Sequence, residues 1–471
     1  MLYNSLQFFF FYIIVTIAYW NLPNKYRWQL LLLSSCYFYM VYIPKYILVL
    51  GCTILIDYIS GIYIEKISNK HVKKSLLIVS LLSNIGILLF FKYFNFLNES
   101  LDNLLSLSSH HTPFPFLDFI LPIGLSFHTF QAMSYIIEVY RGNYKAEKHF
   151  GIYALYVMFY PQLVAGPIER PQNILWQFHK EQKFNFEDMK SGLMQMAFGL
   201  LKKVVIADRI AEIVDQVYKD PKAHNGKTLL VATVLYSFQI YCDFSAYSDI
   251  GIGAARTMGY KLVRNFNAPY ISTSIGEFWN KWHMSLSTWF RDYLYIPLGG
   301  SRVPVARKYL NLMIVFLVSG LWHGASWTFI IWGALHGTFL IVENIKDDIL
   351  KKLEITVRSN LFIKTLQCLS IFMLVTFAWI FFRSPDIATS KTILQNIFSY
   401  SIFGSFEFNL INKFSLFFSF LLIVLLLFKE KYVPVIPTKN TGVFYLVFCV
   451  TLIVSYLFGV FNNAQFIYFQ F

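Results

Sequence analysis

Three histidines within residues 278–336 are the groups in this chain best suited to chemistry. His283 lies in FWNKWHMSLSTWFRDYLYIPLGG, and His323 and His336 lie in GLWHGASWTFIIWGALHG. All three stand among aromatic and small residues in a chain whose apolar composition indicates a membrane protein. An ionisable side chain at membrane depth costs roughly 2.5–3.5 kcal/mol, so its presence there indicates a functional site. Because histidine exchanges a proton near neutral pH, this stretch predicts acid–base chemistry.

Each histidine also has a structural interpretation. The charges between residues 275 and 293 are too many for a membrane span, so we expect a helix at the interface or beside a polar cavity. His283 could simply anchor that helix. The run 309–322 would cover about 21 Å as a helix, against about 30 Å of hydrocarbon. His323 is then expected part-way through the membrane, where a general base is favoured over a packing role.

Further polar residues interrupt apolar segments. The small neighbours of His336 favour helix packing as its role. His128 lies in LPIGLSFHTFQ, and Asp243 and Asp249 lie in YCDFSAYSD. We expect the two aspartates to be buried acceptors or cavity-lining groups rather than catalysts. The residues expected to line a substrate cavity are Asp243, Tyr241, Trp322, Trp282, Ser285 and His336.

The composition indicates which elements must position these residues. Of 471 residues, 56% are hydrophobic and only 14% charged. A soluble domain carries about 25% charged residues, which excludes a water-facing surface over the whole chain. Apolar runs lie at residues 5–21, 29–43, 46–64, 75–97, 117–140, 151–166, 192–217, 228–257, 309–343, 361–382, 412–428 and 442–460. They predict an all-α multi-pass membrane protein of about 11–13 helices in one domain, residues 1–471.

The charge distribution predicts an orientation. The net charge is +14, and Lys and Arg are typically retained in cytoplasmic loops, so we expect membrane topology and not nucleic-acid binding to explain it. The loops 98–118 and 384–409 are nearly free of Lys and Arg and are expected outside, with both termini. The basic loops, expected inside, are residues 25–27, 66–74, 141–148, 302–308, 351–358 and 429–439.

The middle of the chain does not fit one crossing per run. Counting crossings through residues 151–308 would place a basic loop on the wrong side. Pro161, Gly166, Pro167 and Pro171 lie close together there. They predict a broken or re-entrant segment, which is tolerated at membrane depth only where protein or water surrounds it.

Several function classes lack a motif. No GxSxG, HExxH or P-loop sequence occurs, so a hydrolase triad, a zinc protease and an NTPase are unsupported. The first apolar run has no basic flank or cleavage site, and we expect it to be retained as a span. No CxxC pair predicts a metal site or a disulfide framework. The cysteines are scattered singly as Cys36, Cys52, Cys242, Cys368 and Cys449.

Long motifs follow one another along nearly the whole chain. They are LPIGLSFHTFQAMSY, FYPQLVAGPIERP, YCDFSAYSDIGIGAARTMGY, NFNAPY, FWNKWHMSLSTWFRDYLYIPLGG, GLWHG, FAWIFFRS and the terminal FIYFQF. In content and order they resemble the membrane-bound O-acyltransferase family. The resemblance is greatest to the bacterial branch with the membrane subunits of alginate and peptidoglycan O-acetyltransferases and the D-alanyl transfer protein of teichoic acids.

The resemblance implies a fold and roles for two histidines. His323 matches the essential histidine of the family, expected as a general base or, alternatively, a transient acyl carrier. His283 matches the second histidine, expected to orient or polarise a substrate. The implied fold is a ring of membrane helices around a central funnel, entered by the acyl donor from the cytoplasmic side and by the acceptor from the other. The segment LYIPLGG favours acetyl over D-alanyl transfer.

We therefore expect a multi-pass enzyme of the bacterial cytoplasmic membrane that moves an acetyl group toward a cell-envelope polysaccharide. The expected donor is acetyl-CoA or an acyl-carrier thioester, with no bound cofactor or metal. Expected partners are the polysaccharide, membrane lipid and a periplasmic or extracellular acetyltransferase, because the related acetyltransferases work with outer-face proteins. The alternatives are D-alanyl transfer to teichoic acid, a transporter whose buried histidines relay protons, and a non-catalytic membrane scaffold.

Overall fold

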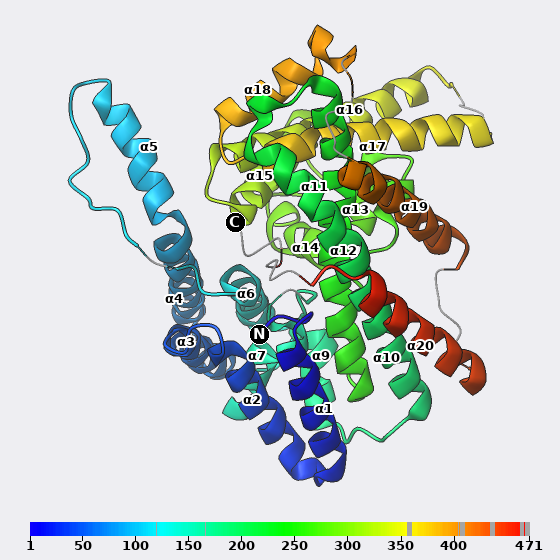
Figure 1. Ribbon diagram of the computed structural model, residues 1–471. Helices are drawn as coiled ribbons and strands as arrows, with labels where there is room; N and C mark the ends of the chain where they lie inside the picture. Colours follow the sequence, from blue (N-terminus) through cyan, green and yellow to red (C-terminus); the bar gives the residue numbers. More distant parts are fainter. Residues whose placement is uncertain are drawn as a thin grey trace. The chain divides into compact units, whose positions relative to one another are not determined.

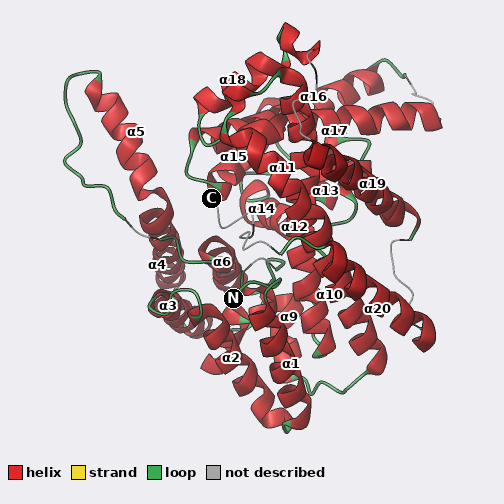
Figure 2. Cartoon of the chain, in the orientation of Figure 1, coloured by secondary structure: helices red, strands yellow, loops and turns green. Residues whose placement is uncertain are grey.

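The described part of the chain is helical throughout. The computed structural model describes residues 1–118, 120–164, 166–355, 360–403, 405, 410–433, 439–461 and 466. Helices and loops account for all of these residues, and no strand occurs among them (Figure 2). The predicted all-α class is confirmed.

Contacts along the chain divide it into two compact units. The first comprises residues 1–196 and 247–263, and the second comprises residues 197–246 and 264–471. The long helix α12 (Gly226–Thr257) contributes residues to both (Figure 1). A single domain over residues 1–471 stays a prediction.

The first unit contains the predicted broken segment. Helix α7 ends at Met158, and the four-residue α8 follows directly. Pro161 lies at the start of α8, where its missing N–H leaves no bond unmade. A Cβ on Gly166 would lie 2.3 Å from the Gln162 Cα, so this turn requires glycine. The unit is built from α1 (Leu6–Asn21), α2 (Asn24–Met40), α3 (Tyr46–Lys66), α4 (Lys70–Leu88), η1 (Leu89–Tyr93), α5 (Phe94–Ser106), α6 (Leu125–Arg141), α7 (Phe150–Met158), α8 (Tyr160–Leu163), α9 (Pro171–His179) and most of α10 (Phe186–Leu201).

The second unit is centred on two closely packed helices, α15 and α16. A Cβ on Gly320 would lie 2.2 Å from the Phe329 carbonyl oxygen, and one on Gly333 would lie 2.3 Å from that of Phe316. The glycines therefore allow the close approach that small residues favour in membranes. The unit contains η2 (Lys202–Ala207), α11 (Asp208–Lys219), η3 (Pro221–Ala223), η4 (Pro269–Ile271), α13 (Ile275–Lys281), α14 (Met284–Phe290), η5 (Arg291–Tyr295), α15 (Val305–His323), α16 (Trp327–Lys352), α17 (Leu361–Arg383), α18 (Ile387–Ile397), η6 (Tyr400–Phe403), α19 (Leu410–Tyr432) and α20 (Thr441–Phe458).

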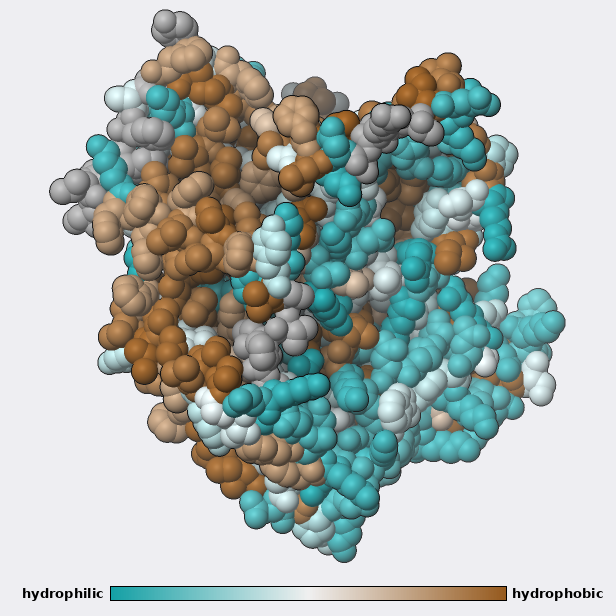
Figure 3. Space-filling model, turned by 90° about the vertical axis from the view of Figure 1, so that its right-hand side faces the viewer, coloured by the Kyte–Doolittle hydropathy of each residue, from teal (hydrophilic) through white to brown (hydrophobic). Residues whose placement is uncertain are grey.

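Seven helical segments within the described residues are long and apolar enough to cross a membrane. They are Tyr46–Lys66, Lys70–Ser106, Gly226–Thr257, Val305–His323, Trp327–Lys352, Leu361–Arg383 and Thr441–Phe458. Other predicted runs form shorter helices, such as the sixteen-residue α1 and the nine-residue α7. Figure 3 shows wide apolar areas on the surface, as expected for lipid contact. The chain is a multi-pass membrane protein, and the count of 11–13 stays a prediction that includes the shorter helices.

Helix α15 is longer than its apolar run indicated. It begins at Val305, and its nineteen residues cover about 28 Å. Arg307 and Lys308 therefore lie in its first turn, where the Lys308 amine donates to the Asn344 side chain at 2.7 Å. The helix is therefore longer than predicted, because charged residues extend it at its start, and it is long enough to cross a membrane. That His323 lies part-way through the membrane stays a prediction. The predicted break after the helix is confirmed at residues 324–326.

The segment 275–293 is not one continuous helix. It forms α13, α14 and the π-helical turn η5, with a break at Trp282 and His283. His283 has φ +43°, in the left-handed region that non-glycine residues rarely adopt. Helical spacing of the aromatic residues predicted the helices but not the turn between them.

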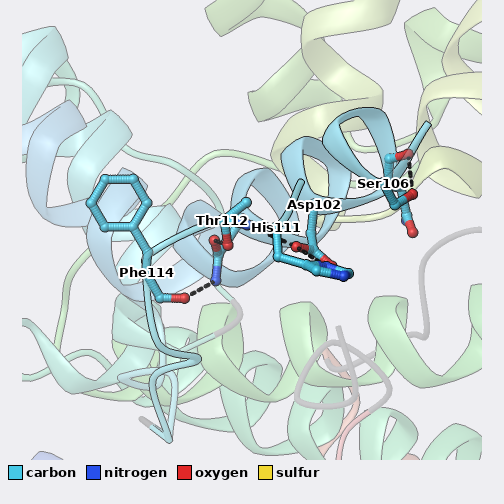
Figure 4. A network of polar contacts seen from close by, with 7 residues as sticks. Asp102, Ser106, His111, Thr112 and Phe114 are labelled. Atoms are coloured by element: carbon cyan, nitrogen blue, oxygen red, sulfur yellow. Dashed lines mark hydrogen bonds and ion pairs between the residues drawn. The ribbon is translucent and has the colours of Figure 1, made fainter. Parts of the chain in front are cut away.

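A polar network holds the loop after α5 along that helix (Figure 4). The Asp102 carboxylate accepts from the Thr112 backbone N–H at 2.9 Å and contacts the His111 ring at 3.2 Å. The Asn98 amide donates to the Phe114 carbonyl at 3.0 Å. The segment Lys70–Ser106, at 37 residues, is about 55 Å long and exceeds the hydrocarbon thickness of about 30 Å. One of its ends must therefore project from the membrane.

The topology can be tested with single cysteines in a background lacking the five native ones. Ser106→Cys should react from outside intact cells with an impermeant maleimide, and Ser68→Cys should react only after permeabilisation, because basic loops stay inside. Both positions are exposed, and Ser68 avoids Asn69, whose side chain caps α4. If only Ser68→Cys were labelled in intact cells, the orientation of the protein would be the opposite of the one predicted.

Candidate functional site

His323 is the last residue of α15, and aromatic rings pack against its imidazole. It is 4% exposed, and its ring centre lies 5.0 Å from that of Trp332 in α16 and 5.2 Å from that of Phe382 in α17. A Cβ on the next residue, Gly324, would lie 2.0 Å from the Phe329 ring. The glycine therefore lets the chain turn here and leaves the imidazole between three packed helices.

His336 lies on the other side of Trp332, with ring centres 4.9 Å apart. The Trp279 ring is at 5.0 Å, and Phe278 and Phe316 lie nearly parallel to the imidazole at 6.4 and 6.2 Å. The side chain is fully buried, and neither ring nitrogen has a hydrogen-bond partner among the described residues. This environment supports the packing role that its small neighbours predicted.

His283 lies at the turn between α13 and α14 and is fully buried. Its ring centre is 4.7 Å from that of Phe244 and 6.1 Å from that of Trp322. Its Nδ1 lies 3.1 Å from the side-chain oxygen of Asn265. Burial lowers the pKa of His283 to about 3, so the imidazole is neutral at physiological pH. Trp322, next to His323 in the chain, connects the environments of the two histidines.

Hydrogen bonds at its start fix α13, the helix that ends two residues before His283. The Ser274 side chain caps α13 by accepting from the Glu277 N–H at 3.0 Å. The Glu343 carboxylate, from α16, accepts from the N–H groups of Ile275 and Gly276 at 2.9 and 2.8 Å. A carboxylate at a helix N-terminus is stabilised by the helix dipole. Helix α13 is therefore tied to the helix that bears His336.

Three predicted cavity residues lie in the same unit as these histidines. Trp282 is almost fully buried and packs against Trp379 at 5.2 Å and Tyr241 at 6.0 Å between ring centres. The Tyr241 hydroxyl donates to the Glu430 carboxylate. The Ser285 hydroxyl donates to the Asn265 side chain at 2.9 Å. All belong to the second unit.

Asp243 is part of a buried ionic cluster that the sequence patterns did not reveal. Lys203 lies 2.7 Å from the carboxylates of both Asp243 and Asp208, and each of the three side chains is at most 5% exposed. Lys203 lies in the π-helical turn η2, a kind of irregularity frequent at functional sites. The sequence feature that could have indicated this cluster was the pair Lys202–Lys203 within an apolar run. Asp243 is thus a buried acceptor, as expected, and its place in a substrate cavity stays a prediction.

Two other predicted polar residues belong to the first unit. His128 is 3% exposed on α6, and the Asp249 carboxylate accepts from the Gln195 side chain at 2.8 Å. The site described above consists only of second-unit residues. Among the described residues no group of three His, Cys, Asp or Glu side chains could hold a metal ion.

The arrangement favours one kind of chemistry. A buried imidazole between aromatic rings is shielded from water, and it can act as a general base on a hydroxyl that reaches it. The neutral imidazole of His283 can hold a second polar group of a substrate. Transfer of an acyl group to a hydroxyl needs these two functions.

Known proteins are similar to this chain over most of its length. Residues 148–384, which include all three histidines, match the family described as MBOAT, membrane-bound O-acyltransferase family. A Pseudomonas aeruginosa protein named "Probable alginate O-acetylase AlgI" is 35% identical over 88% of this chain and 77% of its own. The peptidoglycan O-acetyltransferase of Helicobacter pylori is 35% identical over 78% and 73%. The teichoic acid D-alanyltransferase of Bacillus subtilis is 29% identical over 50% and 61%.

Proposed function

The chain belongs to the membrane-bound O-acyltransferase family, and we propose that it transfers an acetyl group for the O-acetylation of a cell-envelope polysaccharide. The observation that carries this proposal is the extent of the similarity. Relatives named as O-acetyltransferases of alginate and peptidoglycan match 88% and 78% of the chain, and a D-alanyltransferase matches 50%. The family match favours an enzyme over a transporter or a scaffold, and D-alanyl transfer is the second candidate.

In the proposed reaction His323 removes the proton from an acceptor hydroxyl as its oxygen attacks the thioester carbonyl. The new ester bond forms as the carbon–sulfur bond breaks, and the proton passes to the leaving thiolate. His283 holds a polar group of one substrate beside this centre. The donor is acetyl-CoA or an acyl-carrier thioester reaching the site from the cytoplasmic side of the cytoplasmic membrane. Asp243, Tyr241, Trp282, Trp322 and Ser285 complete the lining of the proposed site, and His336 supports it by packing against Trp332.

The proposal includes an outer-face protein that completes transfer to the glycan. A long polysaccharide requires an extended groove. The loops that we expect on the outer face are short, such as residues 107–124 between α5 and α6, and are unsuited to forming such a groove. The apolar C-terminal tail, residues 466–471, is one candidate contact for this outer-face protein. Its first residue, Phe466, is not accessible to a partner, because it is fully buried against Phe244. Residues 467–471 of that tail lie outside the described part of the chain.

Reconstitution tests both statements. Liposomes containing the purified protein receive radiolabelled acetyl-CoA or acetylated carrier inside, and alginate or peptidoglycan outside. Labelled glycan ester should form only when a periplasmic fraction from cells lacking this protein is also added outside. Ester formation without that fraction would refute the need for an outer-face partner. The absence of labelled glycan with either donor would refute acetyl transfer. Parallel liposomes with D-alanyl carrier test the second candidate.

A further inference from the structure

Asn265 gathers three hydrogen bonds on one atom. Its side-chain oxygen lies 3.3 Å from the Ser285 backbone nitrogen, 2.9 Å from the Ser285 hydroxyl and 3.1 Å from Nδ1 of His283. A backbone N–H can only donate, so the atom that Ser285 contacts must be the amide oxygen and not the amide nitrogen. Asn265 is 1% exposed, so water does not compete for this oxygen.

The position of that oxygen determines where His283 carries its proton. An amide oxygen has no hydrogen to donate, so Nδ1 of His283 must be the donor. A neutral imidazole carries one N–H, which leaves Nε2 with a lone pair and no hydrogen. His283 can therefore accept a hydrogen bond from a substrate through Nε2 but cannot donate one to a developing oxyanion.

Backbone hydrogen bonds also hold the loop that contains Asn265 beside His283. The Asn265 carbonyl accepts from the Met284 N–H at 2.9 Å, and the Asn267 N–H donates to the Lys281 carbonyl at 2.9 Å. These bonds enclose His283, whose left-handed backbone conformation is strained for a residue other than glycine. Such strain persists only where surrounding contacts determine the conformation, and here the Asn265 loop supplies those contacts.

We propose that Asn265 is a positioning residue that fixes the Nδ1–H form of His283, so that Nε2 accepts a hydrogen bond from an N–H or O–H group of a substrate. The proposal rests on the proposed acyl transfer. The group held is either an amide N–H of the thioester arm of the donor or a hydroxyl of the acceptor. His323 keeps the role of general base.

The test compares Asn265→Leu and Asn265→Asp, each alone and with His283→Ala, in the reconstituted acetyl-transfer assay. Asn265→Leu should lower kcat/KM at least about tenfold, as expected for loss of a group that orients an active-site imidazole. It should lower activity no further when His283 is already Ala. A rise in the KM of the donor alone assigns the held group to the thioester arm, and a rise in the KM of the acceptor alone assigns it to the acceptor hydroxyl.

Asn265→Asp provides a readout that a structural role would not change. The carboxylate keeps an oxygen acceptor for Ser285 and His283 but favours the protonated imidazole. At high pH the Asn265→Asp variant should retain most of the activity of the parent. As the pH falls, its activity should decline at a higher pH than that of the parent, because the imidazole of His283 is protonated earlier. Asn267→Leu, at an exposed side chain of the same loop, should match the parent.

Two results would overturn the proposal: an unshifted pH profile in Asn265→Asp, or a further severalfold loss when Asn265→Leu is added to His283→Ala. A parent protein without transfer activity under any condition would instead refute the proposed function. Thermal unfolding in detergent identifies any variant that fails to fold, and Asn265→Asp then carries the test.

Discussion

Replacement of His323 by Ala should abolish acetyl transfer while the protein still inserts and purifies at normal yield. Loss of a general base typically lowers a rate about 10²–10⁴-fold, and each tenfold corresponds to about 1.4 kcal/mol of barrier. His323 is the last residue of α15, so truncation leaves the α15–α16 glycine contact intact. The lost packing against Trp332 and Phe382 should cost about 0.5–3 kcal/mol of stability.

The measurement is initial rate at saturating donor and acceptor, together with thermal unfolding in detergent. His111→Ala is the control, because that histidine is exposed in the loop after α5 and should leave the rate unchanged. His283→Ala should also reduce transfer severely. A His323→Ala rate above about 10% of the parent, less than 1.4 kcal/mol of barrier, would exclude His323 as the base.

The sequence allowed the fold class to be predicted correctly, and it singled out the main histidines as site candidates, because both inferences depend on local patterns. Apolar runs longer than about 18 residues require helices in a membrane. The prolines and glycines around Gly166 and Gly324 marked real breaks in the chain. The imidazole of His323 stood out because polar groups are rare in such runs, and that of His283 stood out among the aromatic residues of its segment.

What could not be predicted depends on contacts between distant residues. The hydrogen bond from His283 to Asn265 joins residues eighteen positions apart. Nothing in the motif NFNAPY marks Asn265, the first of its two asparagines, as a partner of His283. The left-handed turn at His283 follows from that loop and not from helix propensity. The length of α15 was underestimated because apolar periodicity does not include the charged first turn that contains Arg307.

The Lys203 cluster illustrates the same limit. Lys203 and Asp243 lie forty positions apart, in η2 and α12, and only the fold brings them to 2.7 Å. Asp243 was recognisable as a polar residue in an apolar helix, but its partner was not.

Lys203→Met should be among the most destabilising single substitutions in the chain. It removes the cation between two buried carboxylates, those of Asp208 and Asp243. Removal of one partner of a buried ion pair costs about 3–5 kcal/mol, because the remaining charge is left without compensation. We expect a loss of this size in the free energy of unfolding, measured by denaturation in mixed micelles, with a matching fall in yield.

Asp243→Asn separates stability from function, because it leaves Lys203 paired with Asp208 and retains an oxygen acceptor. Its unfolding free energy should change by less than about 1.5 kcal/mol. Combining Lys203→Met with Asp243→Asn and Asp208→Asn should recover most of the stability lost in Lys203→Met, since no buried charge is then uncompensated. An equally severe loss in Asp243→Asn, or no recovery in the triple variant, would contradict the electrostatic explanation. If Asp243→Asn is stable but inactive, Asp243 acts on the substrate, and its ion pair with Lys203 holds it in place for that role.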